Sequence, residues 1–166
     1  GVHHLLGGLG RPRVDLIVEA CTQLGLPLKV AGRGPDLARL RTLAGPSIEF
    51  LGFVPDAELP SLMAGCRAFL FSAEEDFGIS PVEAQAAGRP VLAFGAGGCL
   101  ETVVPGVTGA HFAEQSTACL VEALRTFVPE QYAPEQIRAH AAAFSEVCFR
   151  SRIQDLASEL AAGRRG

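Results

Sequence analysis

Apolar residues along the chain fall into short runs that alternate with stretches of helical periodicity. The short runs predict six strands, several without polar alternation, as expected of strands covered on both faces. These strands are His3–Leu6, Leu28–Ala31, Ser47–Leu51, Ala68–Ser72, Val91–Phe94 and Gly109–Phe112. Apolar residues at helical spacing predict helices at Pro12–Leu24, Asp36–Leu43, Asp56–Cys66, Pro81–Ala87, Thr117–Val128, Pro134–Phe144 and Ser145–Ala162.

The alternation of strands and helices, with short loops between them, is typical of a doubly wound parallel sheet. We therefore predict an α/β, Rossmann-like domain with a six-stranded parallel sheet over residues 1–162, followed by a frayed tail at residues 163–166. Glycine clusters follow three of the predicted strands, at Gly32–Gly34, Gly52 and Gly95–Gly98. Because ligands of such sheets bind beyond the carboxyl ends of the strands, these turns mark the predicted binding edge.

Composition narrows the classes of function. The chain has 166 residues, is 48% hydrophobic and has a net charge of −4, which offers no basic face for nucleic acid. No apolar run reaches the ~18 residues of a membrane span, and no signal peptide opens the chain. The five cysteines are odd in number and lack C-x-x-C spacing, so we interpret them as small buried hydrophobes in a reducing, cytoplasmic compartment.

The segment Glu74–Glu83, with the sequence EEDFGISPVE, is a candidate anion site. It follows a predicted strand and opens a predicted helix, with Ser80 suited to the N-cap and Pro81 to the first helical position. The free N–H groups of Gly78–Ser80 would point out of the helix start and, together with the helix dipole, bind a phosphate.

Two carboxylates of this segment have both a functional and a structural interpretation. Glu75 and Glu83 are eight residues apart, and a carboxylate accepts hydrogen bonds from two sugar hydroxyls at once. However, Ser80 and Glu83 also have the spacing of a capping box, in which Glu83 bonds only to the helix start. The acidic run Glu74–Asp76 is equally consistent with a solvated loop near a helix N-terminus.

The longer run Glu74–Pro90, with the sequence EEDFGISPVEAQAAGRP, resembles the E-x7-E signature of family 4 retaining glycosyltransferases. It is similar to bacterial and archaeal mannosyltransferases that use GDP-mannose. Other turns resemble the family in the same order, namely Gly32–Pro35, Phe50–Val54, Gly97–Thr102 and Gly106–Gly109, although Pro105-Gly106 replaces the usual Asp-Gly or Asn-Gly. The resemblance covers nearly the whole chain. It implies the C-terminal, donor-binding half of a two-domain GT-B enzyme, without its N-terminal acceptor domain.

The resemblance also implies roles for individual residues. Glu75 would contact the donor sugar as the catalytic residue, Glu83 would hold the ribose hydroxyls, and Val54 would flank the base. Backbone N–H groups near Gly78–Ser80 would contact the sugar or the diphosphate. The full set of expected donor-binding residues is Gly7, Gly8, Arg11, Arg13, Gly32, Val54, Glu75, Phe77, Gly78, Ile79, Ser80 and Glu83.

The first strand-to-helix loop departs from the family pattern. The family places an Arg and a Lys there, which neutralise the leaving diphosphate, but the aligned positions are Gly7 and Pro12. Either Arg11 or Arg13 substitutes for the missing charge, or both are surface charges, and the glycines of the loop remain able to bind phosphate as a backbone nest.

The expected reaction is transfer of a hexose, mannose from GDP-mannose being the first choice, to a glycan or lipid-linked acceptor with retention of configuration. We expect neither a cofactor nor a metal, an acceptor-binding N-terminal domain or subunit as partner, and membrane contact only peripherally, through that missing half. On its own the chain is expected to be inactive, because half a cleft neither positions the acceptor nor excludes water.

Three alternatives remain open: a non-catalytic nucleotide-sugar-binding or assembly subunit, a fragment of a GT-B-type epimerase, and a plain interaction module. An NAD-dependent oxidoreductase is disfavoured, because the segment Gly8–Arg13 does not complete G-x-G-x-x-G. The histidines lack partners at ligand spacing, so we interpret them as structural.

Overall fold

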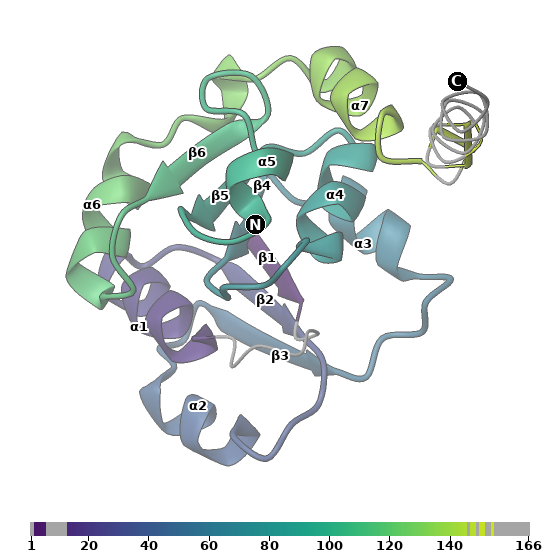
Figure 1. Ribbon diagram of the computed structural model, residues 1–166. Coiled ribbons are helices and arrows are strands. Elements are labelled where there is room, and N and C mark those ends of the chain that lie inside the picture. The colour runs from purple at the N-terminus through teal and green to yellow at the C-terminus, as the bar shows by residue number, and fades with distance from the viewer. Residues whose placement is uncertain (1, 6–12, 146, 149, 152–153, 155–166) are drawn as a thin grey trace.

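The fold is known from a computed structural model, which describes residues 2–5, 13–145, 147–148, 150–151 and 154. Its strands form one parallel sheet in the order β3-β2-β1-β4-β5-β6 (Figure 1). The strands are β1 (Val2–Leu5), β2 (Leu28–Ala31), β3 (Ile48–Gly52), β4 (Ala68–Phe71), β5 (Val91–Phe94) and β6 (Gly109–Phe112). The predicted fold class, an α/β Rossmann-like domain with a parallel sheet, is confirmed.

Helices cover both faces of the sheet (Figure 1). They are α1 (Val14–Leu24), α2 (Leu37–Leu43), α3 (Leu59–Ala64), α4 (Ile79–Ala86), α5 (Cys99–Thr102), α6 (Thr117–Thr126) and α7 (Pro134–Ala142), with a 3₁₀ turn at Pro129–Gln131. Helix α1 packs between α2 and α6, whereas α4 packs against α3, α5 and α7. From β1, the chain adds β2 and β3 on one side of the sheet, and then β4, β5 and β6 on the other. The β1–β4 pair therefore lies at the centre of the sheet.

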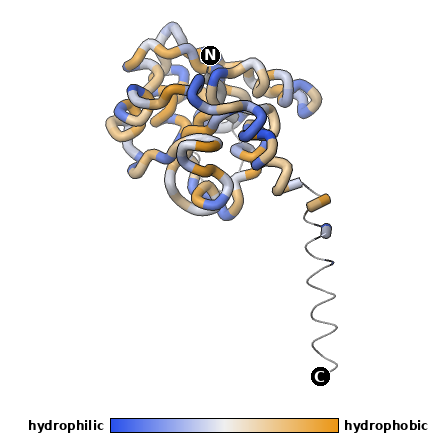
Figure 2. The backbone as a smooth tube through the Cα atoms, turned by 90° about the horizontal axis from the view of Figure 1, so that it is seen from above, coloured by the Kyte–Doolittle hydropathy of each residue, from blue (hydrophilic) through white to orange (hydrophobic). Residues whose placement is uncertain are grey.

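The alternation of side chains along the strands divides the core into two clusters. In β4, Leu70 belongs to the cluster on the α1 and α6 face, together with Ile17 and Leu120. Its neighbours Phe69 and Phe71 point the other way and pack with Met63, Ala84 and Val91 under α3 and α4. All these side chains are almost completely buried, and apolar stretches run through the middle of the body (Figure 2). A sheet buried on both faces explains why the strands lack polar alternation.

The sequence-based boundaries are correct to within two or three residues for most elements. Strands β2, β5 and β6 coincide with their predicted ranges, whereas β3 is shifted by one residue. Helix α5 is not among the predicted helices, because its four residues are too short to show a period. The predicted helix Ser145–Ala162, the tail 163–166 and Leu6 lie wholly or largely outside the described residues.

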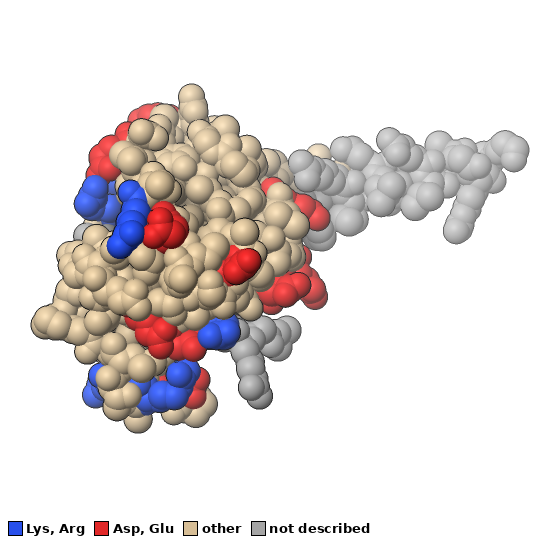
Figure 3. Space-filling model, turned by 90° about the vertical axis from the view of Figure 1, so that its left-hand side faces the viewer, with Lys and Arg blue, Asp and Glu red and all other residues tan. Residues whose placement is uncertain are grey.

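Charge on the surface is mixed. Over α1 and α6, the face shown in Figure 3 carries acidic and basic side chains side by side, without a broad basic patch in its described part. Within the described residues, no helix is both long and apolar enough to cross a membrane. Cys21, Cys66 and Cys99 are buried as expected, and burial raises the pKa of the Cys21 thiol to about 12; Cys119 and Cys148 are partly exposed.

Candidate functional site

The loops that follow β4 and β5 meet at the carboxyl edge of the sheet. Gly98 donates a backbone hydrogen bond of 2.7 Å to the carbonyl of Glu75. A Cβ atom on Gly98 would lie 2.4 Å from the Cα of Phe77, and one on Gly97 would lie 2.3 Å from the carbonyl oxygen of Glu75. Gly97 also has a φ of 55°, in the left-handed region. Only glycines allow the two backbones to come this close, and the contact fixes the position of Glu75. We call this contact the glycine seam.

The Glu75 side chain is held partly out of solvent without a partner. Its Oε1 is a buried oxygen that accepts no hydrogen bond in the described part of the chain. Burial raises the pKa of Glu75 above its ordinary value. Most buried carboxylate oxygens accept a hydrogen bond. An unpaired one at the edge where ligands of such sheets bind therefore indicates a hydrogen-bond acceptor for a ligand.

Helix α4 begins two residues earlier than the sequence suggests. Its N-cap is Gly78, in a left-handed conformation with φ 73°, and its first residue is Ile79. The prediction of Ser80 as N-cap and Pro81 as first helical residue is therefore wrong, because a glycine with positive φ ends the loop before Ser80 is reached. The anion-site geometry survives this correction, since no described residue accepts a hydrogen bond from the N–H groups of Ile79 or Ser80.

The new helix start also changes the interpretation of Glu83. Glu83 lies beyond the first turn of α4 and is exposed, and its side chain makes no hydrogen bond to Ser80 or to another described residue, so the capping box is not formed. Burial and then the nearby charge of Asp56 raise the pKa of Glu83. Asp56 follows β3, two residues after the half-buried Val54. The loop after β3 and helix α4 therefore face each other across the edge.

The ends of β2 and β3 add an exposed aromatic ring and an arginine to this edge. Gly32 donates a 2.7 Å backbone hydrogen bond to the carbonyl of Gly52, which joins the two strand ends. Beyond them, the guanidinium of Arg33 lies over the ring of Phe53, 5.4 Å from its centroid. The Phe53 side chain is 61% exposed. A large exposed aromatic ring at the ligand edge offers a stacking surface.

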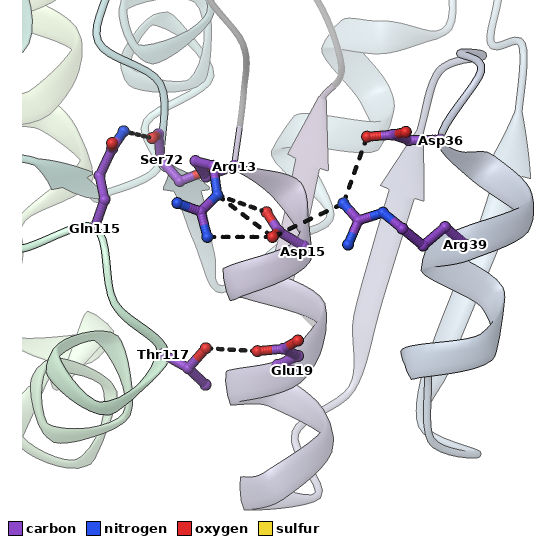
Figure 4. A network of polar contacts seen from close by, with 8 residues as sticks. All are labelled: Arg13, Asp15, Glu19, Asp36, Arg39, Ser72, Gln115 and Thr117. Atoms are coloured by element: carbon purple, nitrogen blue, oxygen red, sulfur yellow. Dashed lines mark hydrogen bonds and ion pairs between the residues drawn. The ribbon is translucent and has the colours of Figure 1, made fainter.

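The predicted phosphate loop is only partly described. Gly7, Gly8 and Arg11 lie outside the described residues. Arg13 is the N-cap of α1 and is ion-paired with Asp15, with 3.0 Å between Arg13 Nε and Asp15 Oδ1 (Figure 4). The hydrogen bonds that Arg13 donates to the Asp15 carboxylate raise the pKa of Arg13, so the guanidinium stays charged. Because α1 follows β1, Arg13 stands at the same carboxyl edge as Glu75.

An open apolar groove adjoins this edge between α4 and α7. Phe77, Ile79, Val82 and Glu83 line one side, and Ala141 and Phe144 the other. The Phe77 ring meets the ring of Phe144 edge-on at 5.8 Å between centroids, yet Phe77 is 45% and Ile79 64% exposed. The groove thus continues the predicted site with exposed apolar surface.

Two of the histidines have structural contacts. His111 Nε2 lies 3.0 Å from the carbonyl oxygen of Cys99, and His140 Nε2 lies 3.2 Å from that of Thr102. Both contacts support the short helix α5, whose Gly98 start forms the glycine seam. Among the described side chains, no three His, Cys, Asp or Glu residues gather as a metal site.

The structure adds site-forming residues that the sequence reasoning missed. Gly97 and Gly98 are predicted as part of a glycine cluster at the binding edge and of a family turn, but not as a close contact with the loop after β4, although two consecutive glycines after a buried strand signal a close backbone approach. Asp15 and Asp56 were not considered, and their roles depend on contacts between elements. The Arg-x-Asp spacing at a helix start was the only local signal for the Arg13–Asp15 pair.

The fold is a Rossmann-like α/β domain of the kind found in GT-B glycosyltransferases. The chain belongs to the family of glycosyl transferases group 1, whose model matches residues 11–144. Glycogen synthase of Mycobacterium tuberculosis is 33% identical over 149 residues, covering 86% of this chain and 34% of that protein. Alpha-1,3/1,6-mannosyltransferase ALG2 of Rhizomucor pusillus is 30% identical over 132 residues, covering 76% of this chain and 29% of that protein.

Solved structures give the same result. The Anabaena protein Alr3699/HepE, solved in complex with UDP-glucose, superposes with a TM-score of 0.79 and 25% identity. The match covers 95% of this chain and 48% of that one. Sucrose-phosphate synthase of Thermosynechococcus elongatus has a TM-score of 0.80 at 23% identity, covering 98% of this chain and 46% of its own. The chain therefore spans about half of these structures and about a third of the curated relatives above.

Proposed function

We propose that this chain binds the nucleotide-sugar donor of a retaining hexosyltransferase. The unpaired Oε1 of Glu75 carries the proposal: it is a buried acceptor, fixed by the glycine seam, at the edge where ligands of parallel sheets bind. Glu75 accepts hydrogen bonds from hydroxyls of the donor sugar. The N–H groups of Ile79 and Ser80 receive the diphosphate at the start of α4.

The nucleoside occupies the space between the loop after β3 and helix α4. Glu83 accepts hydrogen bonds from the ribose hydroxyls, and its position opposite Asp56 and Val54 supports this role. Gly32 and the exposed ring of Phe53 border the base. The phosphate loop contributes Gly7, Gly8, Arg11 and Arg13. The donor site requires no metal in this proposal, since the helix start and arginine side chains balance the diphosphate charge.

The second half of the enzyme supplies the acceptor site. The matched relatives are two to three times longer than this chain, and the apolar groove beside Phe77 and Ile79 is open. We propose that an acceptor-binding domain or subunit, N-terminal in the complete enzyme, closes over this edge. Mannose from GDP-mannose is the first choice of donor, with a glycan or lipid-linked acceptor, in keeping with the mannosyltransferases among the relatives. Closure then excludes water from the reacting sugar.

Calorimetric titration of the chain with GDP, UDP, ADP and GDP-mannose tests the donor site. We expect one base to bind at least about tenfold more tightly than the others, and Glu83→Ala to lower that affinity by about five- to tenfold. The same variant should leave the midpoint of thermal unfolding within about 1 °C, because Glu83 caps nothing. Absence of binding to all four ligands would refute the proposal.

A non-catalytic binding subunit is the second candidate, and the residue at position 12 favours it. Pro12 stands where the family has the lysine that faces the leaving diphosphate. In the completed two-domain enzyme, Pro12→Lys should raise the transfer rate by about tenfold or more if this charge is missing. An unchanged rate would show that another residue already supplies it.

A further inference from the structure

Arg13 is the N-cap residue of α1, and its guanidinium donates hydrogen bonds to the Asp15 carboxylate. We propose that Asp15 is a positioning residue for the donor diphosphate: it fixes the Nε/Nη2 edge of the Arg13 guanidinium and leaves the Nη1/Nη2 edge free for phosphate oxygens. The inference rests on the proposed function, because it assumes a diphosphate at this edge of the sheet.

The hydrogen bonds between the two side chains use only one edge of the guanidinium. Arg13 Nε lies 3.0 and 3.3 Å from the two carboxylate oxygens of Asp15, and Arg13 Nη2 lies 3.2 Å from Oδ2. Nη1 and the outer hydrogen of Nη2 have no acceptor among the described residues. Figure 4 shows Nη1 turned away from Asp15. These remaining donors form the parallel pair that suits two oxygens of a phosphate.

Asp15 is itself held firmly enough to fix its partner. Its side chain is only 16% exposed and lies in the first turn of α1, where the helix dipole favours negative charge. On its other side, Arg39 Nη2 lies 3.8 Å from Asp15 Oδ2 and 3.4 Å from Asp36 Oδ2 (Figure 4). The carboxylate thus stands between two arginines from different helices. The Arg13 side chain is 43% exposed and hydrogen-bonds to no other described residue, and Glu19 attracts it only through the weaker, longer-range charge interaction.

This arrangement reverses the effect expected from charge alone. A carboxylate near an anion site repels the anion, so its removal should tighten binding. If Asp15 orders the Arg13 fork, its removal instead weakens binding, because a long mobile side chain must then be ordered by the ligand. The sign of the change in affinity separates the two cases.

The test is calorimetric titration of the full chain with GDP and UDP, and with guanosine and uridine as ligands without phosphate. We expect Asp15→Ala to weaken binding of the preferred nucleoside diphosphate by about fivefold or more and to leave its nucleoside unchanged. Arg13→Gln should give a similar loss, and the double variant should lose little more, because both act through one contact. Asp15→Asn, which keeps one acceptor oxygen, should fall between wild type and Asp15→Ala and serves as the test variant if Asp15→Ala does not fold.

Asp36→Asn is the matched control. It removes a carboxylate from the same network without touching Arg13, so diphosphate affinity should stay the same or rise by up to about twofold. Equal or tighter diphosphate binding by Asp15→Ala, with normal binding by the wild type, would overturn this inference alone. A wild-type chain that binds no nucleoside diphosphate would overturn the proposed function as well.

Discussion

At the scale of single residues, the predicted site has two acidic side chains in different surroundings. Glu75 is fixed in a loop with one oxygen dehydrated, whereas Glu83 is exposed on α4 with Asp56 facing it. Partial desolvation of the carboxyl group is the main cause of the raised pKa in both, although Glu83 as a whole residue is exposed. Each carboxylate is therefore less stable in its charged form than it would be in water. In the proposed donor complex, hydrogen bonds from sugar and ribose hydroxyls would offset this loss.

We expect Glu75→Gln to raise the midpoint of thermal unfolding at pH 7 by about 1–3 °C, since the neutral amide avoids a partly dehydrated charge. The pKa of Glu75 is raised in the folded chain, so protonation favours folding. That stabilisation is present in acid and is lost as the pH rises through the raised pKa. The difference between variant and wild type should thus vanish below about pH 4, in thermal scans at several pH values.

The same variant should bind the nucleotide sugar at least about tenfold more weakly. An amide has only one acceptor oxygen, whereas the carboxylate accepts a hydroxyl hydrogen bond at each of its two oxygens. Stability and binding then change in opposite directions. A Glu75→Gln chain that is less stable than the wild type at pH 7 would show that the carboxylate supports the fold rather than a ligand.

At the residue scale, the sequence prediction was wrong about local geometry at the start of α4, whereas the roles of the site residues stay predictions. The E-x7-E spacing singled out Glu75 and Glu83, but the helix start was placed at Pro81 although α4 begins at Ile79. Ser80 and Pro81 fit the N-terminal preferences at more than one offset. Whether a glycine takes a left-handed φ depends on what surrounds it, and for Gly78 that includes Cys99 from another loop.

At the scale of elements, the glycine seam connects the loop after β4 to helix α5. Its two glycines touch backbone atoms, which cannot move aside as a side chain can. The backbone positions of Glu75 and Phe77 therefore depend directly on those of β5 and α5. This arrangement explains why both loops, though exposed at an edge, have defined positions.

Gly98→Ala tests the seam. The added Cβ would lie 2.4 Å from the Phe77 Cα, so we expect a loss of about 1–3 kcal/mol in the free energy of unfolding and about tenfold weaker binding of nucleotide sugar. Gly65→Ala is the matched control, because its Cβ would meet backbone oxygens no closer than 3.5 Å. Urea denaturation and calorimetry measure the two effects, and equal values for both variants would contradict the account.

Helix α1 offers a second test of an element. Ile17 is completely buried between the sheet and α6, so Ile17→Ala should lower the free energy of unfolding by about 2–5 kcal/mol. Leu100, 61% exposed on α5, should change it by less than about 0.5 kcal/mol when replaced by Ala. Denaturant unfolding of the two variants measures the difference, which would be small if α1 were loosely attached.

Most elements were predictable because each strand is a short apolar run and each long helix has a buried stripe. The exceptions are informative. Helix α5 has only four residues, and its ends are fixed by His111, Thr102 and the seam rather than by periodicity. The contact of Asp15 with Arg39 joins two helices, and no local pattern encodes a contact between elements.

At the scale of the whole molecule, the chain covers about half of the solved relatives. Its proposed donor edge and the adjoining groove are open, with Phe77 and Ile79 exposed at their junction. Such apolar surface beside a polar binding edge is typical of a face that another domain covers. Binding and catalysis should therefore be separable in this chain.

We expect residues 1–166 alone to bind the preferred nucleoside diphosphate with a dissociation constant in the micromolar to millimolar range, but to transfer no sugar. Calorimetry measures the first, and chromatography of radiolabelled sugar with candidate glycan acceptors measures the second. Transfer by the isolated chain at a rate comparable to a complete enzyme would contradict the proposed division of labour.

Redesign of donor preference meets a constraint at Gly97 and Gly98. Any side chain added there displaces the acidic loop, so the proposed sugar site cannot be reshaped from the β5 side by single replacements. A library that varies residues 74–78 while keeping both glycines should retain folded members, whereas one that varies the glycines alone should not. Changes of donor preference would then have to come from residues 74–78 and not from the loop after β5.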